Sequence, residues 1–272
     1  MFKKHLRTEG IILRKLSLNE GDIIVTLLTK EHGKIDCIAK SARRIKSRFL
    51  GRLELFNRID ATLFSGRNLD VINEIETVGS QNFAAATVGT RHGASTGTPD
   101  NATHFLPNCA AAFFITEITH RLLQPGQHIA GAYPLFLEAL SLLGRRPNAE
   151  GLMTGYLIQL FGLLGHMPSW RICAVCGESL DLQTPLTLAH EGLAVCCAKC
   201  SKNSAGFALG KTDEVLLKIV HFLQTHTLKE ACQLNLSKEK ETLWQWIQNV
   251  LRALLPYAIK SGSFAEEVMK SY

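Results

Sequence analysis

The sequence predicts an α+β protein of more than one domain, in which a small β-barrel comes first and a helical domain with an inserted cysteine module follows. Three observations support this. The first 80 residues alternate apolar stretches with turn residues, the pattern becomes helical from residue 105, and two Cys-x-x-Cys pairs interrupt the helical part. A chain of 272 residues is long enough for two or three domains with cores of their own.

Five strands are predicted in the first 80 residues. They cover residues 9–15, 22–29, 35–39, 53–64 and 69–77. Tight turns are predicted at "KEHG" (30–33) and "SGRN" (65–68), because each contains the Gly or Asn that such turns need. Five short strands with a longer excursion between the third and fourth are typical of a Greek-key barrel of the OB-fold type. Such barrels commonly bind single-stranded nucleic acid.

The longer excursion is strongly basic. It reads "AKSARRIKSRFLGR" (39–52) and contains no acid but six cations, which are Lys40, Arg43, Arg44, Lys46, Arg48 and Arg52. Residues 1–80 contain 15 Lys and Arg against 10 Asp and Glu, so this segment carries +5 of the formal charge of +6. Charge concentrated in this way favours a surface that follows a phosphate backbone. A solvated loop without a ligand is the alternative, and the sequence leaves it open.

The rest of the chain divides into a connection and a helical domain. Residues 81–104 are predicted to be a linker or flexible loop, because they are mostly small and polar and show no periodicity. Helices are expected at 105–123, 132–143 and 148–164 within a helical domain at 105–272. On the last long helix, five apolar residues form one stripe that predicts a core face: Leu243, Ile247, Val250, Leu251 and Leu254.

Two cysteine pairs predict a structural metal site at about residues 170–202. Cys173 and Cys176 are followed, after twenty residues, by Cys197 and Cys200. Two such pairs on tight turns can present four thiolates to one Zn²⁺, and a site with four thiolates leaves no open position for catalysis. Three alternatives stay open: Cys196 or His190 replaces one of the four ligands, or the cysteines bind no metal.

No catalytic residues are predicted. The sequence contains no G-x-x-x-x-G-K-[ST], no H-E-x-x-H, and no G-x-G-x-x-G after a strand, which favours a binding protein over an enzyme. It has no apolar run of about 18 residues, and "MFKKHLRTEG" has no apolar stretch after its lysines. A cytoplasmic protein with reduced cysteines and no membrane segment is therefore expected.

Two stretches of the sequence resemble a known family. The segment "EGIILRKLSLNEGDIIVTLLTKEHGKIDCIAKSARRIKSRFLGRLELF" is similar to the N-terminal region of the bacterial DNA repair and recombination mediator family RecO. The segment "LLGHMPSWRICAVCG", with the later "CAKC", resembles the zinc segment of that family. The Gly- and Thr-rich stretch at 84–104 and the additional Cys196 depart from its pattern.

The resemblance implies a non-enzymatic protein of recombinational DNA repair. It implies an OB-fold domain at 1–80 that binds single- and double-stranded DNA, with the six cations of the excursion on phosphates, and one structural Zn²⁺. Such proteins anneal complementary strands coated with single-strand-binding protein, and with the mediator RecR they help load the RecA recombinase. They are expected near the nucleoid, and the acidic C-terminal tail of the single-strand-binding protein is an expected ligand. Two alternatives are a zinc-containing RNA-binding accessory factor and a zinc-ribbon enzyme acting on nucleic acid.

Overall fold

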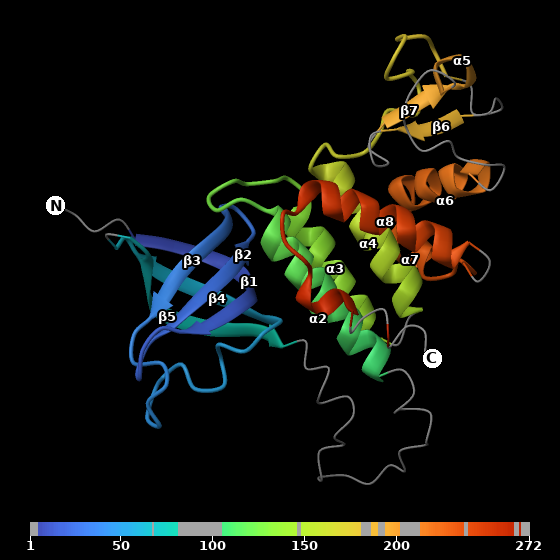
Figure 1. Ribbon diagram of the computed structural model, residues 1–272. Coiled ribbons are helices and arrows are strands. Elements are labelled where there is room, and N and C mark those ends of the chain that lie inside the picture. The colour runs from blue at the N-terminus through green and yellow to red at the C-terminus, as the bar shows by residue number, and fades with distance from the viewer. Residues whose placement is uncertain are drawn as a thin grey trace, which may run out of the picture. The chain divides into compact units, whose positions relative to one another are not determined.

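The computed structural model describes residues 5–66, 68–80, 105–145, 148–180, 186–189, 194–201, 213–236, 239–263 and 267 (Figure 1). Contacts divide the chain into two compact units, the first made of Met1–Ala149 with Ile259–Tyr272 and the second of Glu150–Ala258. The predicted linker at 81–104 lies outside the described residues. Among the helices that are described, none is both long enough and apolar enough to cross a membrane.

The first unit contains a closed five-stranded barrel with the strand order β1-β2-β3-β5-β4 (Figure 1). The strands are β1 (His5–Ser17), β2 (Ile23–Thr29), β3 (Gly33–Ala39), β4 (Asn57–Phe64) and β5 (Asp70–Ser80). Neighbouring strands pair antiparallel except β3 and β5, which pair parallel through Cys37↔Asp70 and Ile38↔Val71. A five-stranded sheet followed by helices confirms the predicted fold class.

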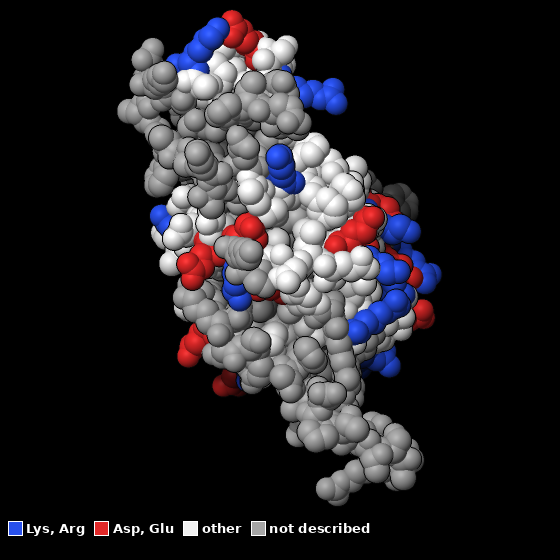
Figure 2. Space-filling view, turned by 90° about the vertical axis from the view of Figure 1, so that its right-hand side faces the viewer, with Lys and Arg blue, Asp and Glu red and all other residues white. Residues whose placement is uncertain are grey.

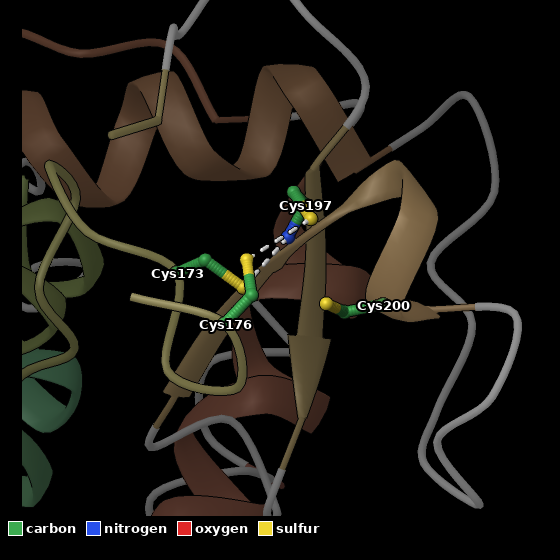
Figure 3. Close-up of side chains that lie close together, drawn as sticks. All are labelled: Cys173, Cys176, Cys197 and Cys200. Atoms are coloured by element: carbon green, nitrogen blue, oxygen red, sulfur yellow. Dashed lines mark hydrogen bonds between the residues drawn. The ribbon is translucent and has the colours of Figure 1, made fainter. Parts of the chain in front are cut away.

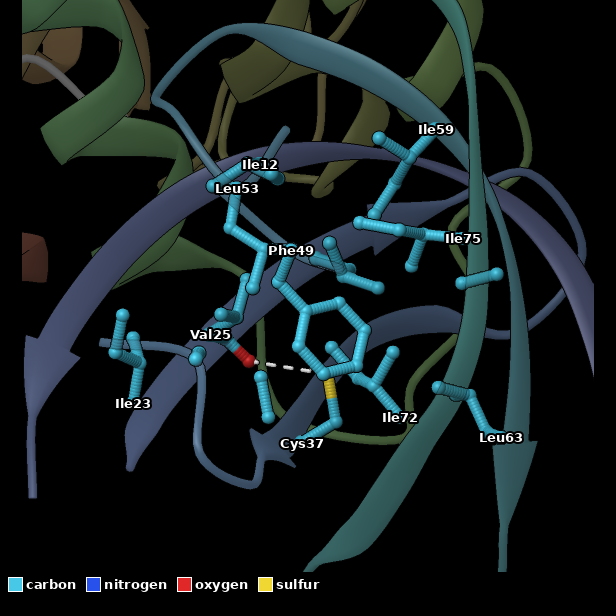
Figure 4. Packing of buried hydrophobic residues seen from close by; sticks show 14 residues of the cluster. Ile12, Ile23, Val25, Cys37, Phe49, Leu53, Ile59, Leu63, Ile72 and Ile75 are labelled. Carbon is cyan, nitrogen blue, oxygen red and sulfur yellow. Dashed lines mark hydrogen bonds between the residues drawn. The ribbon is translucent and has the colours of Figure 1, made fainter. Parts of the chain in front are cut away.

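The barrel closes around an apolar core. In β4, buried and partly exposed residues alternate, so that Ile59, Ala61 and Leu63 point inward. Figure 4 shows these strands contributing side chains to one cluster, in which the Cys37 thiol donates to the Val25 carbonyl at 3.3 Å. The alternating pattern read from the sequence therefore corresponds to a real inner face.

All five predicted strands differ from the structure at one or both ends, and the difference is largest for two of them. The strand expected at 53–64 begins only at Asn57, because Phe56 has a φ of 68°, which is incompatible with an extended strand. The prediction started too early because Leu53 and Phe56 are apolar and buried, as strand residues would be. The first strand is longer than the predicted 9–15, because residues 5–11 of β1 pair with β4 and residues 10–17 pair with β2.

The turn between β2 and β3 approaches the segment that follows the first helix very closely. Gly33 has a φ of 70°, and a Cβ at this position would lie 2.1 Å from the carbonyl oxygen of Gln127. The Gly126 amide donates to the Lys34 carbonyl at 2.8 Å, and Lys34 forms an isolated bridge with Pro125. Only glycine fits at residue 33 without moving one of the two segments.

The helices α2 (Phe105–Leu122) and α3 (Ala132–Leu143) belong to the same unit as the barrel. The buried Lys34 ammonium donates to the His120 carbonyl near the end of α2, where a cation is favourable to the helix dipole. The Tyr133 hydroxyl donates to Glu9 of β1. In addition, the Glu117 carboxylate on α2 accepts from the amides of residues 260 and 261, which ties the returning chain to this unit.

The second unit combines four helices with a small cysteine module (Figure 1). The helices are α4 (Ala149–Leu163), α6 (Asp213–Thr225), α7 (Leu228–Ala231) and α8 (Lys240–Leu254). The module contains β6 (Leu186–Ala189), β7 (Ala194–Cys197) and the one-turn helix α5 (Ala198–Ser201).

The helices predicted at 105–123, 132–143 and 148–164 match α2, α3 and α4. The stripe of α8 is buried except for Leu254, which is partly exposed, and Trp246 joins its buried face.

Candidate nucleic-acid interface and metal centre

The basic excursion forms a series of tight turns that leaves the barrel between β3 and β4 (Figure 1). We call residues 40–52 the basic loop. The Ser47 amide donates to the Arg44 carbonyl at 2.8 Å, the Leu50 amide to Ser47 at 3.2 Å and the Arg52 amide to Phe49 at 3.1 Å. Successive turns of this kind satisfy part of the loop backbone and limit its conformations.

Apolar side chains hold the basic loop against the barrel core. Phe49 is 4% exposed and Leu53 2% exposed, and both belong to the core cluster together with Ala42 (Figure 4). Sequence reasoning did not identify these anchors. Their signal was the spacing of Phe49, Leu53 and Phe56, which are four and three residues apart, as expected for one face of a turning segment.

The start of the basic loop is also bound to the hairpin between β1 and β2. The Arg43 amide donates to the Gly21 carbonyl at 3.0 Å, and its guanidinium donates to the Asn19 carbonyl at 3.0 Å. The Asp22 carboxylate accepts from the Ser41 amide at 2.7 Å, and this bond is the main reason that the pKa of Asp22 is lowered. Apolar side chains thus attach the loop to the barrel core, and hydrogen bonds attach its start to the hairpin.

All six cations predicted to bind DNA are exposed on the basic loop: Lys40, Arg43, Arg44, Lys46, Arg48 and Arg52. Among the described residues, none of them forms a salt bridge with a carboxylate. Arg52 donates to the Ile75 carbonyl at 3.3 Å, and the Arg48 guanidinium lies 5.0 Å from the centre of the Phe49 ring. Their charges are therefore presented to solvent without a paired acid.

The described surface that Figure 2 shows has mixed charge. Figure 2 views the molecule from the right-hand side of Figure 1, and on the described part of that face Lys and Arg lie intermixed with Asp and Glu. The electric fields of opposite charges that lie side by side largely cancel at a distance. This described surface does not repeat the arrangement of the basic loop, where neighbouring cations form no salt bridge with any described acid.

The four predicted metal ligands come together in the cysteine module. The sulfur atoms of Cys173, Cys176, Cys197 and Cys200 all lie within 4.8 Å of one another (Figure 3). Cys173 and Cys176 lie on one tight turn, Cys197 ends β7, and Cys200 lies on α5. Four convergent thiol groups could hold one metal ion.

Backbone geometry builds the first of the two turns. The Gly177 amide donates to the Cys173 carbonyl at 3.0 Å, and the Cys173 amide donates to Glu178 at 2.8 Å. Gly177 has a φ of 72°, the left-handed conformation that glycine adopts most readily. The Ala174 amide donates to the Val195 carbonyl at 2.9 Å, which attaches this turn to β7 and brings the two cysteine pairs to one place.

The thiols differ in how easily they ionise. Amide groups, above all that of Cys176, lower the pKa of Cys173 to about 6. The side chain of Cys197 is the main cause that raises the pKa of Cys200 to about 12. Four adjacent thiolates repel one another, and a divalent cation between them removes that repulsion and releases protons. The donor set therefore fits a soft or borderline divalent metal ion.

Of the two alternative ligands, one is placed by the structure. Cys196 is buried, and it packs against Cys173 in the apolar base of the module. It does not belong to the four cysteines whose sulfur atoms converge. His190 lies outside the described residues.

Comparison with protein families matches both parts of the chain. Residues 1–81 match the family described as "Recombination protein O N terminal", and residues 105–261 match "Recombination protein O C terminal". The first segment includes the barrel with the basic loop, and the second includes all four converging cysteines. The two segments together span more than half of the chain.

Relatives of known name cover most of the chain. The DNA repair protein RecO of Bifidobacterium longum subsp. infantis is 35% identical over 215 residues, which are 77% of this chain and 82% of that protein. RecO of Symbiobacterium thermophilum is 30% identical over 73% of this chain and 72% of its own. RecO of Dehalococcoides mccartyi is 27% identical over 88% and 86%. Since two family models and relatives of one name agree over the barrel and the helical region, the chain belongs to the RecO family of DNA repair proteins.

Proposed function

We propose that this protein anneals complementary single strands of DNA and helps to load the RecA recombinase onto strands coated with single-strand-binding protein. One observation carries the proposal: the basic loop presents six exposed cations, none of which forms a salt bridge within the described part of the chain, on a barrel of the type that binds single strands. A DNA repair family is the setting in which such a surface meets single-stranded DNA.

In this proposal, Lys40, Arg43, Arg44, Lys46, Arg48 and Arg52 contact phosphates. Two strands resist pairing partly because their backbones repel each other, and a cationic surface that binds both lowers this repulsion. Phosphate contacts also leave the Watson–Crick edges free, because they involve only the outside of the strand. Annealing of this kind requires no bond to break, so the protein acts without catalysis.

The cysteine module has a structural role in the same proposal. Cys173, Cys176, Cys197 and Cys200 hold one Zn²⁺, and a site with four thiolates has no position for water or substrate. The metal stabilises a module whose two strands have only four residues each. We also propose that the chain divides into a domain at 1–80, which binds DNA, and a domain at 105–272, which binds the protein partners.

The partners follow from the same reading. We propose that the basic loop binds double-stranded as well as single-stranded DNA, because phosphates occur in both. RecR and the acidic tail of the single-strand-binding protein are proposed as protein partners, in line with the recombination role of the family.

The test is annealing of two complementary oligonucleotides, each coated with single-strand-binding protein, with and without this chain. Annealing should be faster with the wild type and markedly slower with an Arg43→Ala, Arg44→Ala variant. Glu20→Gln, which removes an exposed charge of opposite sign from the neighbouring hairpin, serves as the matched control and should not slow annealing. Strand cleavage that depends on divalent ions would favour an enzyme instead, and a strong preference for RNA would favour an RNA-binding accessory factor.

A further inference from the structure

The basic loop exposes apolar side chains as well as cations. Ile45 is 91% exposed and Leu50 is 65% exposed, and Ile45 stands between Arg44 and Lys46. The loop is attached to the barrel through other residues, so neither side chain contributes a buried anchor. Two large aliphatic groups in contact with water in the middle of a cationic surface indicate a ligand with both charged and apolar parts.

More exposed aliphatic side chains lie on the neighbouring hairpin. Leu16 and Leu18 are exposed, and the hydrogen bonds of Ser41 and Arg43 join their hairpin to the loop. Among the described barrel residues, four of the five exposed large hydrophobic side chains belong to this loop and hairpin, and the fifth is Val78. Single exposed apolar residues are ordinary on protein surfaces, whereas a group that coincides with the cations calls for a common explanation.

Single-stranded nucleic acid has the required chemistry. Its phosphates are anionic, and the faces of its unpaired bases are apolar, whereas a duplex keeps those faces stacked inside. Resting on the proposed DNA-binding function, we infer that Ile45 and Leu50 contact the base faces of a single strand whose phosphates lie on the basic loop. The contact is aliphatic, because none of the exposed large hydrophobic residues of the described barrel is aromatic.

Aliphatic contact has a mechanistic consequence for pairing. Stacking on an aromatic ring holds a base strongly, by about 1–3 kcal/mol per base. A branched aliphatic side chain touches the base face without a ring on which to stack, so the base is separated from its neighbour but is not trapped. A strand held in this way keeps its pairing edges accessible to a complementary strand.

The test measures the binding of two strands of equal length and equal phosphate number. One is a mixed-sequence oligodeoxynucleotide, and the other is an abasic deoxyribose-phosphate strand. Ile45→Ser should weaken binding of the base-bearing strand by about fivefold, on the scale of partial burial of one aliphatic side chain. It should leave binding of the abasic strand and the salt dependence unchanged. Val78→Ser is the matched control, and it should change neither strand's affinity.

Other outcomes overturn the inference. An equal loss on both strands would mean that Ile45 acts through the conformation of the loop, and no loss on either strand would mean that it contacts no base. The Arg43→Ala, Arg44→Ala variant separates this inference from the proposed function. If that variant binds both strands more weakly while Ile45→Ser has no effect, the base contact fails and the phosphate surface stands. If that variant binds both strands normally, the DNA surface lies elsewhere and both proposals fail.

Discussion

At the scale of single residues, the cations of the basic loop provide the sharpest test. Arg43 and Arg44 are adjacent, exposed and, among the described residues, without a salt bridge to an acid. Each phosphate contact that is lost should reduce the slope of log affinity against log salt by about 0.7 for a single strand. An Arg43→Ala, Arg44→Ala variant should therefore lose about 1.4 units of slope, equally for any base sequence.

The measurement is a salt titration of binding to mixed-sequence single-stranded DNA, with circular dichroism to verify that both proteins are folded. Lys30→Ala, an exposed cation at the end of β2 and outside the loop, is the comparison. A double variant with the slope and affinity of the wild type would identify the basic loop as a solvated connection.

His120 gives a second residue-scale prediction, which concerns pH. Burial, together with the nearby cations Lys34 and Arg14, lowers the pKa of His120 to about 4. The unfolded imidazole titrates near about 6.5, so the unfolded state takes up the proton first as the pH falls. This group's contribution to stability is therefore complete above about pH 6.5 and is lost between about pH 6.5 and about pH 4.

A His120→Gln variant should consequently lose less stability than the wild type between about pH 7.5 and about pH 5. Denaturant midpoints at the two pH values measure this difference. His32→Gln, at an exposed position in the turn before β3, should retain the pH dependence of the wild type. The same dependence in all three proteins would remove His120 from the explanation.

At the scale of elements, the cysteine module and the basic loop differ in how far the sequence predicts them. The four cysteines that converge are those chosen from spacing alone, because the ligands of such a site lie on two short turns and are recognisable locally. The anchoring of the loop by Phe49 and Leu53 depends on a barrel that closes around them. Burial of that kind depends on the tertiary structure, which the sequence pattern does not reveal. The strand predicted to begin at Leu53 therefore begins four residues later, at Asn57.

The cysteine module carries the third prediction. Cys173→Ser should release the proposed Zn²⁺ and destabilise the second unit, because it removes one thiolate of four and the binding free energy of a structural metal is folding free energy. DNA binding by the barrel should change little. Elemental analysis of protein purified without chelator measures the metal directly.

Cys196→Ser is the control for this experiment, since Cys196 lies outside the converging group. It should leave the metal content unchanged, although the loss of a buried thiol costs some stability. Less than about half an equivalent of zinc in the wild type would contradict the assignment of a structural zinc site.

At the scale of the whole molecule, the sequence predicts that a barrel precedes the helices, but it does not predict which helices share a compact unit with the barrel. The change of pattern near residue 105 marks the first described helix, α2. Yet α2 and α3 belong to the same compact unit as the barrel, and so does the chain from Ile259. Contacts such as that of Glu117 with the Ser261 amide join residues far apart in sequence, and no local pattern predicts them.

The close contact between the β2–β3 turn and the segment after α2 has a consequence for cutting the protein into parts. β3 pairs with β5 through only two residue pairs, and the Gly126 amide binds the Lys34 carbonyl where β5 does not reach. A fragment that ends at residue 80 would leave this edge of β3 open to the edge of another molecule. We expect the isolated barrel to aggregate with rising concentration more readily than the full chain, as sedimentation velocity would measure, and an equally monodisperse fragment would contradict this. The segment between α2 and α3 thus covers part of the edge of β3, and it protects the barrel from pairing with another molecule.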